Sequence, residues 1–458
     1  MAGYSFSREP KEVPFVNTEF RWIHTPIPAP GTKEILDSLD LYESRSMHGQ
    51  LPLVWDRAED FSVFDIADNK WIDFTSTIFV ANVGHSNKRV TNAISSTLDK
   101  PIYSCYAYGN KIRAEYLEKL IKFAGEPFEK AFLLSAGTEA TEAALKLMRM
   151  YGQKQNKRRR GIICIEGNWH GRTLGAQMMS GNLAQRDWIG YQDADIHHIP
   201  FPYPWVLNGS SPEAFLEKGL ADLEASGIDL SKDVCGFMLE TFQGWGAVFY
   251  PSEFVKAIEA LCRKNNILLA FDEMQAGFGR TGAAFGFQHY GVTPDLIACG
   301  KGMGGGVSLS GVLGRAEIMD LPDIGNMSST HSANPLVCAA GMAVIEEIES
   351  RNLISESARK GALLFDALHR LQASHPGRID RILGKGMIAA VIFCNPDSGG
   401  PDALFTSRVA ELCMQKGLLV VHTGRESIKI GPPLTISDEA LLEGVGVLDE
   451  AIVEIGNQ

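Results

Sequence analysis

The chain has 458 residues, of which 45% are hydrophobic and 21% are charged, and its mean hydropathy is -0.05. These values are ordinary for a globular protein and show no bias towards a membrane protein. A formal net charge of -12 argues against binding to nucleic acid, whose phosphates attract a basic surface. The length exceeds what one hydrophobic core usually serves, so we expect two or three domains.

Targeting and redox features of the sequence both favour a cytoplasmic protein. The longest apolar run, Leu336 to Ile345, is much shorter than the ~20 residues of a membrane-spanning helix and predicts a buried helix. The start, MAGYSFSREPKEVPF, lacks the basic and then apolar regions of a secretory signal, which favours a cytoplasmic protein. Eight cysteines are scattered singly, with no C-x-x-C pair and no histidine at zinc spacing. Reduced thiols are therefore expected, and neither disulfides nor a metal site.

The first element along the chain is a hairpin at residues 61–76, with Asp-Asn-Lys at its turn. Short apolar runs then alternate with segments of helical period, the pattern of βαβ units in a mostly parallel sheet. Seven runs are predicted as strands: 131–135, 161–166, 196–201, 234–240, 267–273, 296–300 and 310–314. The clearest helix extends from about Thr138 to Tyr151, because its apolar residues recur at three- and four-residue spacing. The basic run KQNKRRR (154–160) follows it and is predicted to be a solvated loop, not a binding tail.

The pattern changes after about residue 346. A long helix at 355–374 precedes the apolar run GMIAAVIFC, a helix around 403–415, GLLVV and SIKIGPPLTIS, which together predict a smaller α+β domain. The expected organisation is an N-terminal segment (1–75) that packs with the small domain, a large domain (76–345) and the C-terminal small domain (346–458). The fold class is α/β.

A carboxylate ends the buried strand ILLAF, where Asp272 and Glu273 follow. In α/β proteins ligands bind at the carboxyl ends of the strands, so Asp272 is a candidate ligand group. The alternative is that these side chains cap or brace the next loop.

The start of a helix supplies a second feature, in SAGTEATEAALKL (135–147). Gly137 and Thr138 open the helix, and its free N–H groups with the threonine hydroxyl suit a phosphate. Alternatively Thr138 only caps the helix. Glu139 and Glu142 suit the helix dipole equally well and would repel a phosphate if they pointed at it.

Lys301 supplies the third feature, within LIACGKGMGGG (296–306). The loop matches G-x-G-x-x-G after a strand, but a dinucleotide fingerprint normally opens the first βαβ unit and holds no long cation. A P-loop would need Ser or Thr directly after the lysine. The glycines give another molecule close access to the lysine, and a desolvated lysine is a nucleophile for carbonyls. A solvated lysine in a flexible loop is the alternative.

The three features together match the needs of one cofactor. An aldehyde with a phosphate tail and a pyridine nitrogen requires an amine, an anion site and a carboxylate. Lys301, the helix start at Gly137–Thr138 and Asp272 supply them, so the sequence predicts pyridoxal 5'-phosphate (PLP).

The chain resembles the class-III (subgroup II) aminotransferases of PLP fold type I along nearly its whole length. The motifs that carry the resemblance occur in the family's order: SAGTEATEAALKL, GNWHGRTLGAQ, LETFQGWG, FDEMQAGFGRTG, PDLIACGKGMGGG, STHSANPLVCAA and GPPLTIS. The resemblance implies a large domain with a mostly parallel seven-stranded sheet and a smaller α+β domain. It also implies a homodimer with shared active sites, and an amine or amino acid and a keto acid as substrates, with no nucleic-acid or membrane partner.

The resemblance also implies catalytic roles. Lys301 would be the Schiff-base lysine and, once freed by substrate, the base that moves the Cα proton. Asp272 would keep the pyridine nitrogen protonated, and Trp169 would stack on the ring unless it is a core indole. His170 is interpreted as local structure more than chemistry.

The remaining roles concern binding. Gly137–Thr138 would hold the phosphate, joined by Thr330 from the neighbouring subunit. Gln275 would lie near the cofactor hydroxyl and Glu240 near the substrate, and Gln243 is a weaker candidate for the same pocket.

Lys429 departs from the family pattern. Where many relatives have Arg-x-x-Pro-Pro-Leu, with the arginine on the substrate carboxylate, this chain has SIKIGPPL. Lysine keeps the charge but loses the bidentate geometry. We therefore expect Lys429 to meet a phosphonate, a phosphate or a displaced carboxylate, unless it does not contact substrate. The Pro that commonly follows the family's Glu is missing after Glu240, and Met274 stands where Val is frequent.

The predicted reaction is transfer of an amino group from an ω-amine, or from an amino acid with a remote acidic group, to a keto acid. The same scaffold hosts lyases that eliminate ammonia or phosphate from small amino-phosphonates or amino-phosphates, and amino-acid racemases. Outside PLP chemistry, the G-x-G-x-x-G match leaves an NAD-dependent dehydrogenase as an alternative. No sequence feature favours a catalytically inactive binding module.

Overall fold

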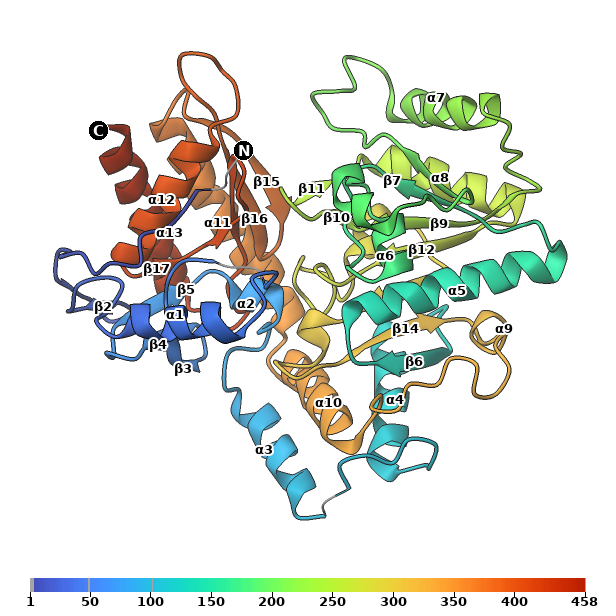
Figure 1. Cartoon of the computed structure of the whole chain (residues 1–458), viewed down its shortest axis with the longest axis horizontal. Helices are drawn as coiled ribbons and strands as arrows, with labels where there is room; N and C mark the ends of the chain where they lie inside the picture. Colours follow the sequence, from blue (N-terminus) through green and yellow to red (C-terminus); the bar gives the residue numbers. More distant parts are fainter. Residues whose placement is uncertain (1–3, 48–49, 101, 458) are drawn as a thin grey trace.

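The computed structural model of the chain describes residues 4–47, 50–100 and 102–457. One half of the molecule contains a seven-stranded sheet, and the other half contains the N-terminal sheet and a four-stranded sheet (Figure 1). Within the described ranges every helix is too short or too polar to cross a membrane.

The N-terminal sheet has six strands, one of them from the far end of the sequence. Its strands are β1 (Val16–Asn17), β2 (Trp22–Ile23), β3 (Trp55–Glu59), β4 (Ser62–Asp65), β5 (Lys70–Asp73) and β17 (Leu418–Leu419). β4 and β5 are antiparallel, which confirms the predicted hairpin, and Asp68 takes the left-handed φ of 65° that its tight turn requires. β17 pairs in parallel with β5. This pairing joins the N-terminal sheet to the C-terminal part of the chain. The domain boundaries stay a prediction.

The central sheet has the order β6-β14-β13-β12-β9-β7-β8. Its strands are β6 (Lys130–Leu134), β7 (Gly161–Ile165), β8 (Ile196–Ile199), β9 (Val234–Glu240), β12 (Leu268–Asp272), β13 (Leu296–Cys299) and β14 (Ser310–Gly314). All seven predicted strands are confirmed. Only β14 is antiparallel to its neighbours, and the other pairs are parallel.

Alternation along each strand gives the sheet two apolar faces. Ala270 and Ala298 belong to the core that includes α5 (Gly137–Gln155), whereas Phe271 and Ile297 belong to the core on the other face. The second face is covered by α4 (Lys111–Ala124), α7 (Pro212–Ala225) and α8 (Ser252–Asn265). Because both faces are covered, the strands are continuous apolar runs, as a buried parallel sheet requires.

The C-terminal part surrounds an antiparallel sheet of order β15-β16-β19-β18. Its strands are β15 (Ile379–Lys385), β16 (Ile388–Phe393), β18 (Val421–His422) and β19 (Ser427–Ile430). The helices are α11 (Leu353–Ser374), α12 (Ala403–Gln415) and α13 (Asp438–Gly456), so both predicted helices are confirmed. α10 (Pro335–Ser350) contains the apolar run 336–345 and is largely buried, as predicted.

Shorter elements connect these layers. They are α1 (Thr32–Tyr42), α2 (Ser76–Phe79), α3 (Lys88–Leu98), α6 (Leu174–Met179), α9 (Ala316–Met319), the hairpin strands β10 (Phe242–Gln243) and β11 (Val248–Phe249), and the 3-10 turns Leu183–Ile189, Gly286–Tyr290 and Lys301–Met303.

The basic run 154–160 is only partly the solvated loop that its charge predicts. Arg159 is 6% exposed, and its guanidinium donates to the carbonyl oxygens of Val234 (2.7 Å) and Asn266 (3.0 Å). The expectation of a fully solvated loop is therefore wrong at this residue, because the guanidinium satisfies backbone acceptors at the edge of the sheet.

Candidate functional site

Strand register places two carboxylates side by side. In the parallel pair β12–β9, Asp272 is the partner of Glu240, and both residues lie at the carboxyl ends of their strands. Both are buried. Burial raises the pKa of Glu240 to about 8, and the neighbouring Asp272 carboxylate adds to that rise.

Asp272 is held by two contacts. Its Oδ1 accepts a hydrogen bond from the Met274 backbone N–H (3.0 Å), and its Oδ2 lies 2.9 Å from Nδ1 of His170. His170 is fully buried, and its Nε2 has no partner among the described residues. The interpretation of His170 as local structure misses this contact, because 102 residues separate the two side chains and no local pattern reports it.

Glu273, the adjacent acid, has a structural role. It accepts hydrogen bonds from the backbone N–H groups of Gly286 (2.7 Å) and Phe287 (2.8 Å) and from the hydroxyl of Thr241. Of the two acids that end the strand, Glu273 therefore braces a loop, and Asp272 faces the α5 side of the sheet with Glu240.

Lys301 follows β13 in a left-handed conformation, with φ 46°. Burial lowers the pKa of its amine, and the Asp272 and Glu240 carboxylates oppose this effect. An amine with a lowered pKa is more often unprotonated and therefore more nucleophilic. The alternative of a solvated lysine does not fit this burial.

The glycines around Lys301 serve the chain's own packing. A Cβ on Gly300 would lie 2.6 Å from Sδ of Met274, and one on Gly302 would lie 2.4 Å from Nδ2 of Asn82. The two glycines thus have a packing role, and the expected access of another molecule to Lys301 stays a prediction. They let the loop lie directly against neighbouring side chains.

Glu240 links the acids to Trp169. Its Oε2 accepts hydrogen bonds from the backbone N–H groups of Trp169 (2.9 Å) and Gly244 (3.3 Å). Trp169 is 36% exposed, so it is not a core indole, and its stacking on the cofactor ring stays a prediction.

Arg172 is a cation at this site that the sequence analysis did not select. Its guanidinium carbon lies 4.2 Å from the centroid of the Trp169 ring, and NH1 is 3.3 Å from Oε1 of Gln185. The motif GNWHGRTLGAQ contains this arginine three residues after Trp169, which was the available signal.

Lys429 comes to the site from the other sheet. Nζ donates to Oε1 of Gln275 (2.8 Å) and lies 4.4 Å from the centroid of the Phe79 ring. Burial lowers the pKa of Lys429 to about 7, although Glu240 acts against the shift. Phe79 ends a turn, Ser76–Phe79, in which all four residues have left-handed φ between 46° and 70°. Such a conformation persists only where surrounding contacts hold it.

Side chains at the start of α5 make hydrogen bonds with neighbouring backbone and hydroxyl groups. Ala136, not Thr138, is the N-cap residue, so the simple capping alternative is wrong, and the Thr138 hydroxyl lies 2.7 Å from that of Thr173. Glu139 accepts from the backbone N–H of Ala136 (2.8 Å). The Glu142 carboxylate accepts from the N–H groups of residues 175 and 176, so both acids are engaged with backbone donors.

Two predicted residues lie apart from this group within the described structure. Thr330 lines a groove with Glu139 and Glu142 on the outer side of α5. Gln243 is fully buried, and its Nε2 donates to the carbonyl of Glu166 (2.7 Å) while its Oε1 accepts from the Trp245 indole (2.7 Å). Their proposed roles stay predictions.

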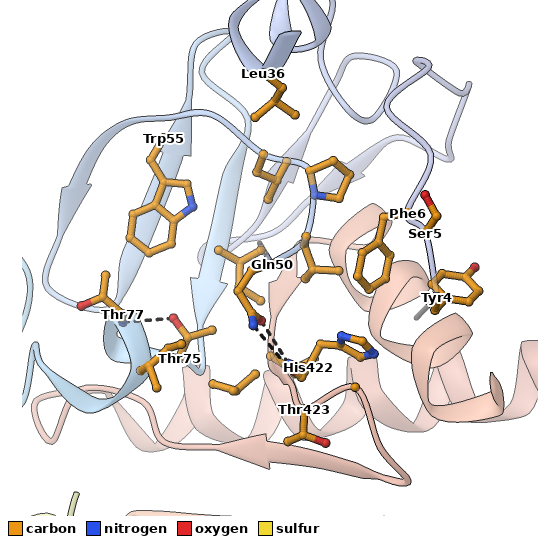
Figure 2. Close-up of a pocket in the computed structure, with 18 of the residues that line it drawn as sticks. Tyr4, Ser5, Phe6, Leu36, Gln50, Trp55, Thr75, Thr77, His422 and Thr423 are labelled. Carbon is orange, nitrogen blue, oxygen red and sulfur yellow. Dashed lines mark hydrogen bonds between the residues drawn. The ribbon is translucent and has the colours of Figure 1, made fainter. Parts of the chain in front are cut away.

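A separate cavity of about 770 Å3 lies between the N-terminal segment and residues 419–424 (Figure 2). Trp55, Gln50 and His422 face it. Among the described residues that line this cavity there is no predicted site residue.

Comparison with known proteins decides the family. The family model of aminotransferase class-III matches residues 43–452. The 4-aminobutyrate aminotransferase of Mycobacterium leprae (strain TN) is 31% identical over 444 residues, with 94% of this chain and 98% of that protein covered. The chain belongs to the class-III aminotransferases. It is a PLP-dependent enzyme of fold type I.

Further relatives agree with this assignment. The acetylornithine aminotransferase of Caldanaerobacter subterraneus subsp. tengcongensis is 30% identical, with 89% of this chain and 96% of that protein covered. The ornithine aminotransferase structure from Toxoplasma gondii ME49 matches with a TM-score of 0.82 at 25% identity, covering 93% of this chain and 96% of that chain. The ω-transaminase from Pseudomonas jessenii, determined with PMP, matches with a TM-score of 0.85 at 23% identity, covering 92% of this chain and 98% of that chain, which shows the shared fold.

The residues present fit PLP. A buried amine (Lys301), a buried carboxylate (Asp272), a helix N-terminus with Thr138, and the exposed indole of Trp169 provide the four kinds of contact that the cofactor needs. The buried His170 holds the carboxylate in place.

Replacing His170 tests its function. In His170→Phe, Asp272 loses the imidazole Nδ1 that contacts its Oδ2, and we expect PLP affinity to fall about tenfold, as for other ligand-orienting partners. Equilibrium dialysis against PLP measures this directly. Circular dichroism should show an unchanged fold. An unchanged PLP affinity in a folded variant would contradict the role.

Proposed function

We propose that the enzyme moves an amino group from an ω-amine, or from an amino acid with a remote acidic group, to a keto acid. The observation that carries the proposal is a pair of cations at the site. Arg172 stacks on the Trp169 ring, and Lys429 donates a hydrogen bond to Gln275. Two cations suit a substrate whose acidic group is remote from the reacting amine, and a dicarboxylate acceptor. The names of the relatives, 4-aminobutyrate and acetylornithine aminotransferase, support the same substrate class.

The chain's own residues have distinct tasks in this proposal. PLP, when bound, withdraws electrons from the substrate carbon that carries the amine. Lys301 holds the cofactor and, once released by substrate, moves a proton at that carbon. Asp272 keeps the ring nitrogen protonated, and His170 orients Asp272. Trp169 covers one face of the ring and excludes water from it.

The remaining contacts are for binding. The N-terminus of α5, at Gly137–Thr138, would hold the phosphate. Gln275 would lie beside the cofactor hydroxyl, and the hydrogen bond from Lys429 would fix its orientation. Glu240, whose raised pKa makes it available in both protonation states near neutral pH, would face the substrate. Gln243 remains a weaker substrate candidate.

Lys429 also favours a second function. A lysine is a compact point charge that binds phosphate without the planar geometry of arginine. A PLP-dependent lyase that eliminates phosphate or ammonia from a small amino-phosphonate or amino-phosphate is therefore the rival reaction.

A homodimer with shared sites is part of the proposal. Large apolar side chains are exposed within residues 102–108, including Tyr103 (63% exposed) and Tyr108 (80%), and at Ile324. The Tyr106 hydroxyl donates to Ser328 (2.9 Å), so the two segments lie together. Exposed apolar surface of this kind favours a protein interface, and Thr330 lies in the same loop, from which it would reach the partner's phosphate site.

We also propose a cytoplasmic location. The eight cysteines are free, and six of them are buried. Free thiols in this number favour a reducing compartment.

One assay separates the two reactions. PLP-loaded protein is incubated with 4-aminobutyrate, acetylornithine, phosphoethanolamine or 2-aminoethylphosphonate, with and without 2-oxoglutarate or pyruvate. New amino acid that forms only in the presence of the keto acid is the expected result. Ammonia or phosphate released without any acceptor would refute the aminotransferase proposal and support the lyase.

The pKa of Lys429 predicts a pH dependence for the binding of acidic substrates. With a pKa of about 7, Lys429 is charged below neutral pH and loses its charge as the pH rises. The KM for 2-oxoglutarate should therefore rise between pH 7 and pH 9, by at most about tenfold per unit. In Lys429→Arg the guanidinium stays protonated, so the KM should stay nearly constant over that range. An equal rise in both enzymes would show that another group titrates.

A further inference from the structure

Two hairpins meet at the boundary between the seven-stranded and the four-stranded sheets. One is β10–β11, whose turn (244–247) follows Gln243; the other is β18–β19, whose turn (423–426) precedes Ser427. The guanidinium carbon of Arg425 lies 3.9 Å from the centroid of the Trp245 ring. The hydroxyl of Ser427 donates to the carbonyl of Trp245 (3.1 Å). The contact therefore joins segments that are 180 residues apart in sequence.

A second stack lies beside the first. Arg381 of β15 lies over the Trp205 ring, 4.5 Å from its centroid, and Trp205 stacks on Tyr203 with centroids 4.6 Å apart. The two guanidinium groups come from the four-stranded sheet and its β18–β19 turn, whereas the aromatic rings come from the half that contains the seven-stranded sheet. Cation–π contacts between half-exposed groups are individually weak, so each can break and re-form.

Both stacks converge on one side chain. Oε1 of Gln243 accepts hydrogen bonds from the Trp245 indole and from the Tyr203 hydroxyl, and its Nε2 donates to the Glu166 carbonyl. Gln243 is fully buried. Its carboxamide thus ties the aromatic side of the contact to the seven-stranded sheet.

Each partner of the Arg425–Trp245 contact lies close in sequence to a residue of the proposed substrate site. The backbone N–H of Gly244, in the turn that carries Trp245, donates to Glu240. Lys429 lies two residues after Ser427 on β19, and therefore on the same face of that strand. Whatever fixes the Arg425 turn against the Trp245 turn also fixes Lys429 relative to Glu240.

We infer that Arg425 and Trp245 are positioning residues. Their stack, called the latch below, holds the strand that carries Lys429 against the segment that carries Glu240, and so fixes the geometry of the substrate site. The inference rests on the proposed roles of Lys429 and Glu240 at that site. Arg425 is exposed enough to leave the ring, since half of its side chain is exposed and its guanidinium also contacts the adjacent Glu426 (3.0 Å).

The chain offers a matched control. Arg57 lies 4.0 Å from the centroid of the Phe64 ring, and 52% of its side chain is exposed, against 50% for Arg425. Arg57 and Phe64 both belong to the N-terminal sheet, so Arg57→Ala removes a similar stack that joins no two sheets.

The first measurement is hydrogen–deuterium exchange of the PLP-loaded enzyme without substrate. In Arg425→Ala the amides of residues 421–430 should exchange about threefold faster, the factor expected for loss of one exposed cation–π contact. Arg425→Lys should restore part of the protection, and Arg57→Ala should leave this segment unchanged. Unchanged exchange in Arg425→Ala would overturn the latch, whatever the substrate panel shows.

The second measurement is steady-state kinetics with 4-aminobutyrate and 2-oxoglutarate. We expect Arg425→Ala to raise the KM values about threefold with little change in kcat. In a Trp245→Ala background, Arg425→Ala should cause no further rise in KM, because the two residues act as one contact. Faster exchange with unchanged KM values, or additive effects of the two substitutions, would overturn the positioning role. If the wild-type enzyme is inactive with this pair, the kinetics use the donor and acceptor that the substrate assay identifies; failure of that whole assay would refute the proposed function and leave the exchange result to decide whether the latch exists.

Discussion

The burial of the Lys301 amine beside Asp272 and Glu240 is the constraint on which the site depends. Water stabilises charged groups, so burial alone pushes Lys301 and Glu240 towards their neutral forms. The opposite charges act against that tendency, and the outcome is a lysine with a lowered pKa and a glutamic acid with a pKa of about 8. A carboxyl group with a pKa of about 8 exchanges protons readily near neutral pH, and a lysine with a lowered pKa is more often unprotonated; both favour amino-group transfer.

The fold creates this arrangement through strand register. β9 and β12 run in parallel and end together, so Glu240 and Asp272 are neighbours, and β13 delivers Lys301 at the same edge of the sheet. Apolar packing on both faces fixes these strands. The four-stranded sheet then brings Lys429, and the Arg425–Trp245 contact holds it there. Under the proposed function, the seven-stranded sheet carries the reacting groups together with Glu240, and the four-stranded sheet adds Lys429 to the substrate site.

Much of this could be predicted from local sequence. Continuous apolar runs identified all seven strands, because a buried parallel strand has no polar face, and the motifs around Asp272 and Lys301 identified the family. The pairing of His170 with Asp272 could not be predicted, because it depends on how β7 and β12 lie in the sheet. The burial of Arg159 could not be predicted either. Its charge predicts exposure, but its hydrogen-bond acceptors are backbone carbonyls from distant parts of the sequence. The close packing of the glycines beside Lys301 against Met274 and Asn82 could not be predicted either, because these neighbours come from distant parts of the sequence.

Two buried lysines, Lys301 and Lys429, have lowered pKa values, so the identity of the amine that holds the cofactor is the central claim. Borohydride reduction of the PLP-loaded enzyme, followed by proteolysis and mass spectrometry, tests it most directly. The account predicts that the reduced cofactor is found on the peptide containing Lys301 and that Lys301→Ala fixes none. Cofactor found on Lys429, or no fixed cofactor in the wild-type enzyme, would contradict it.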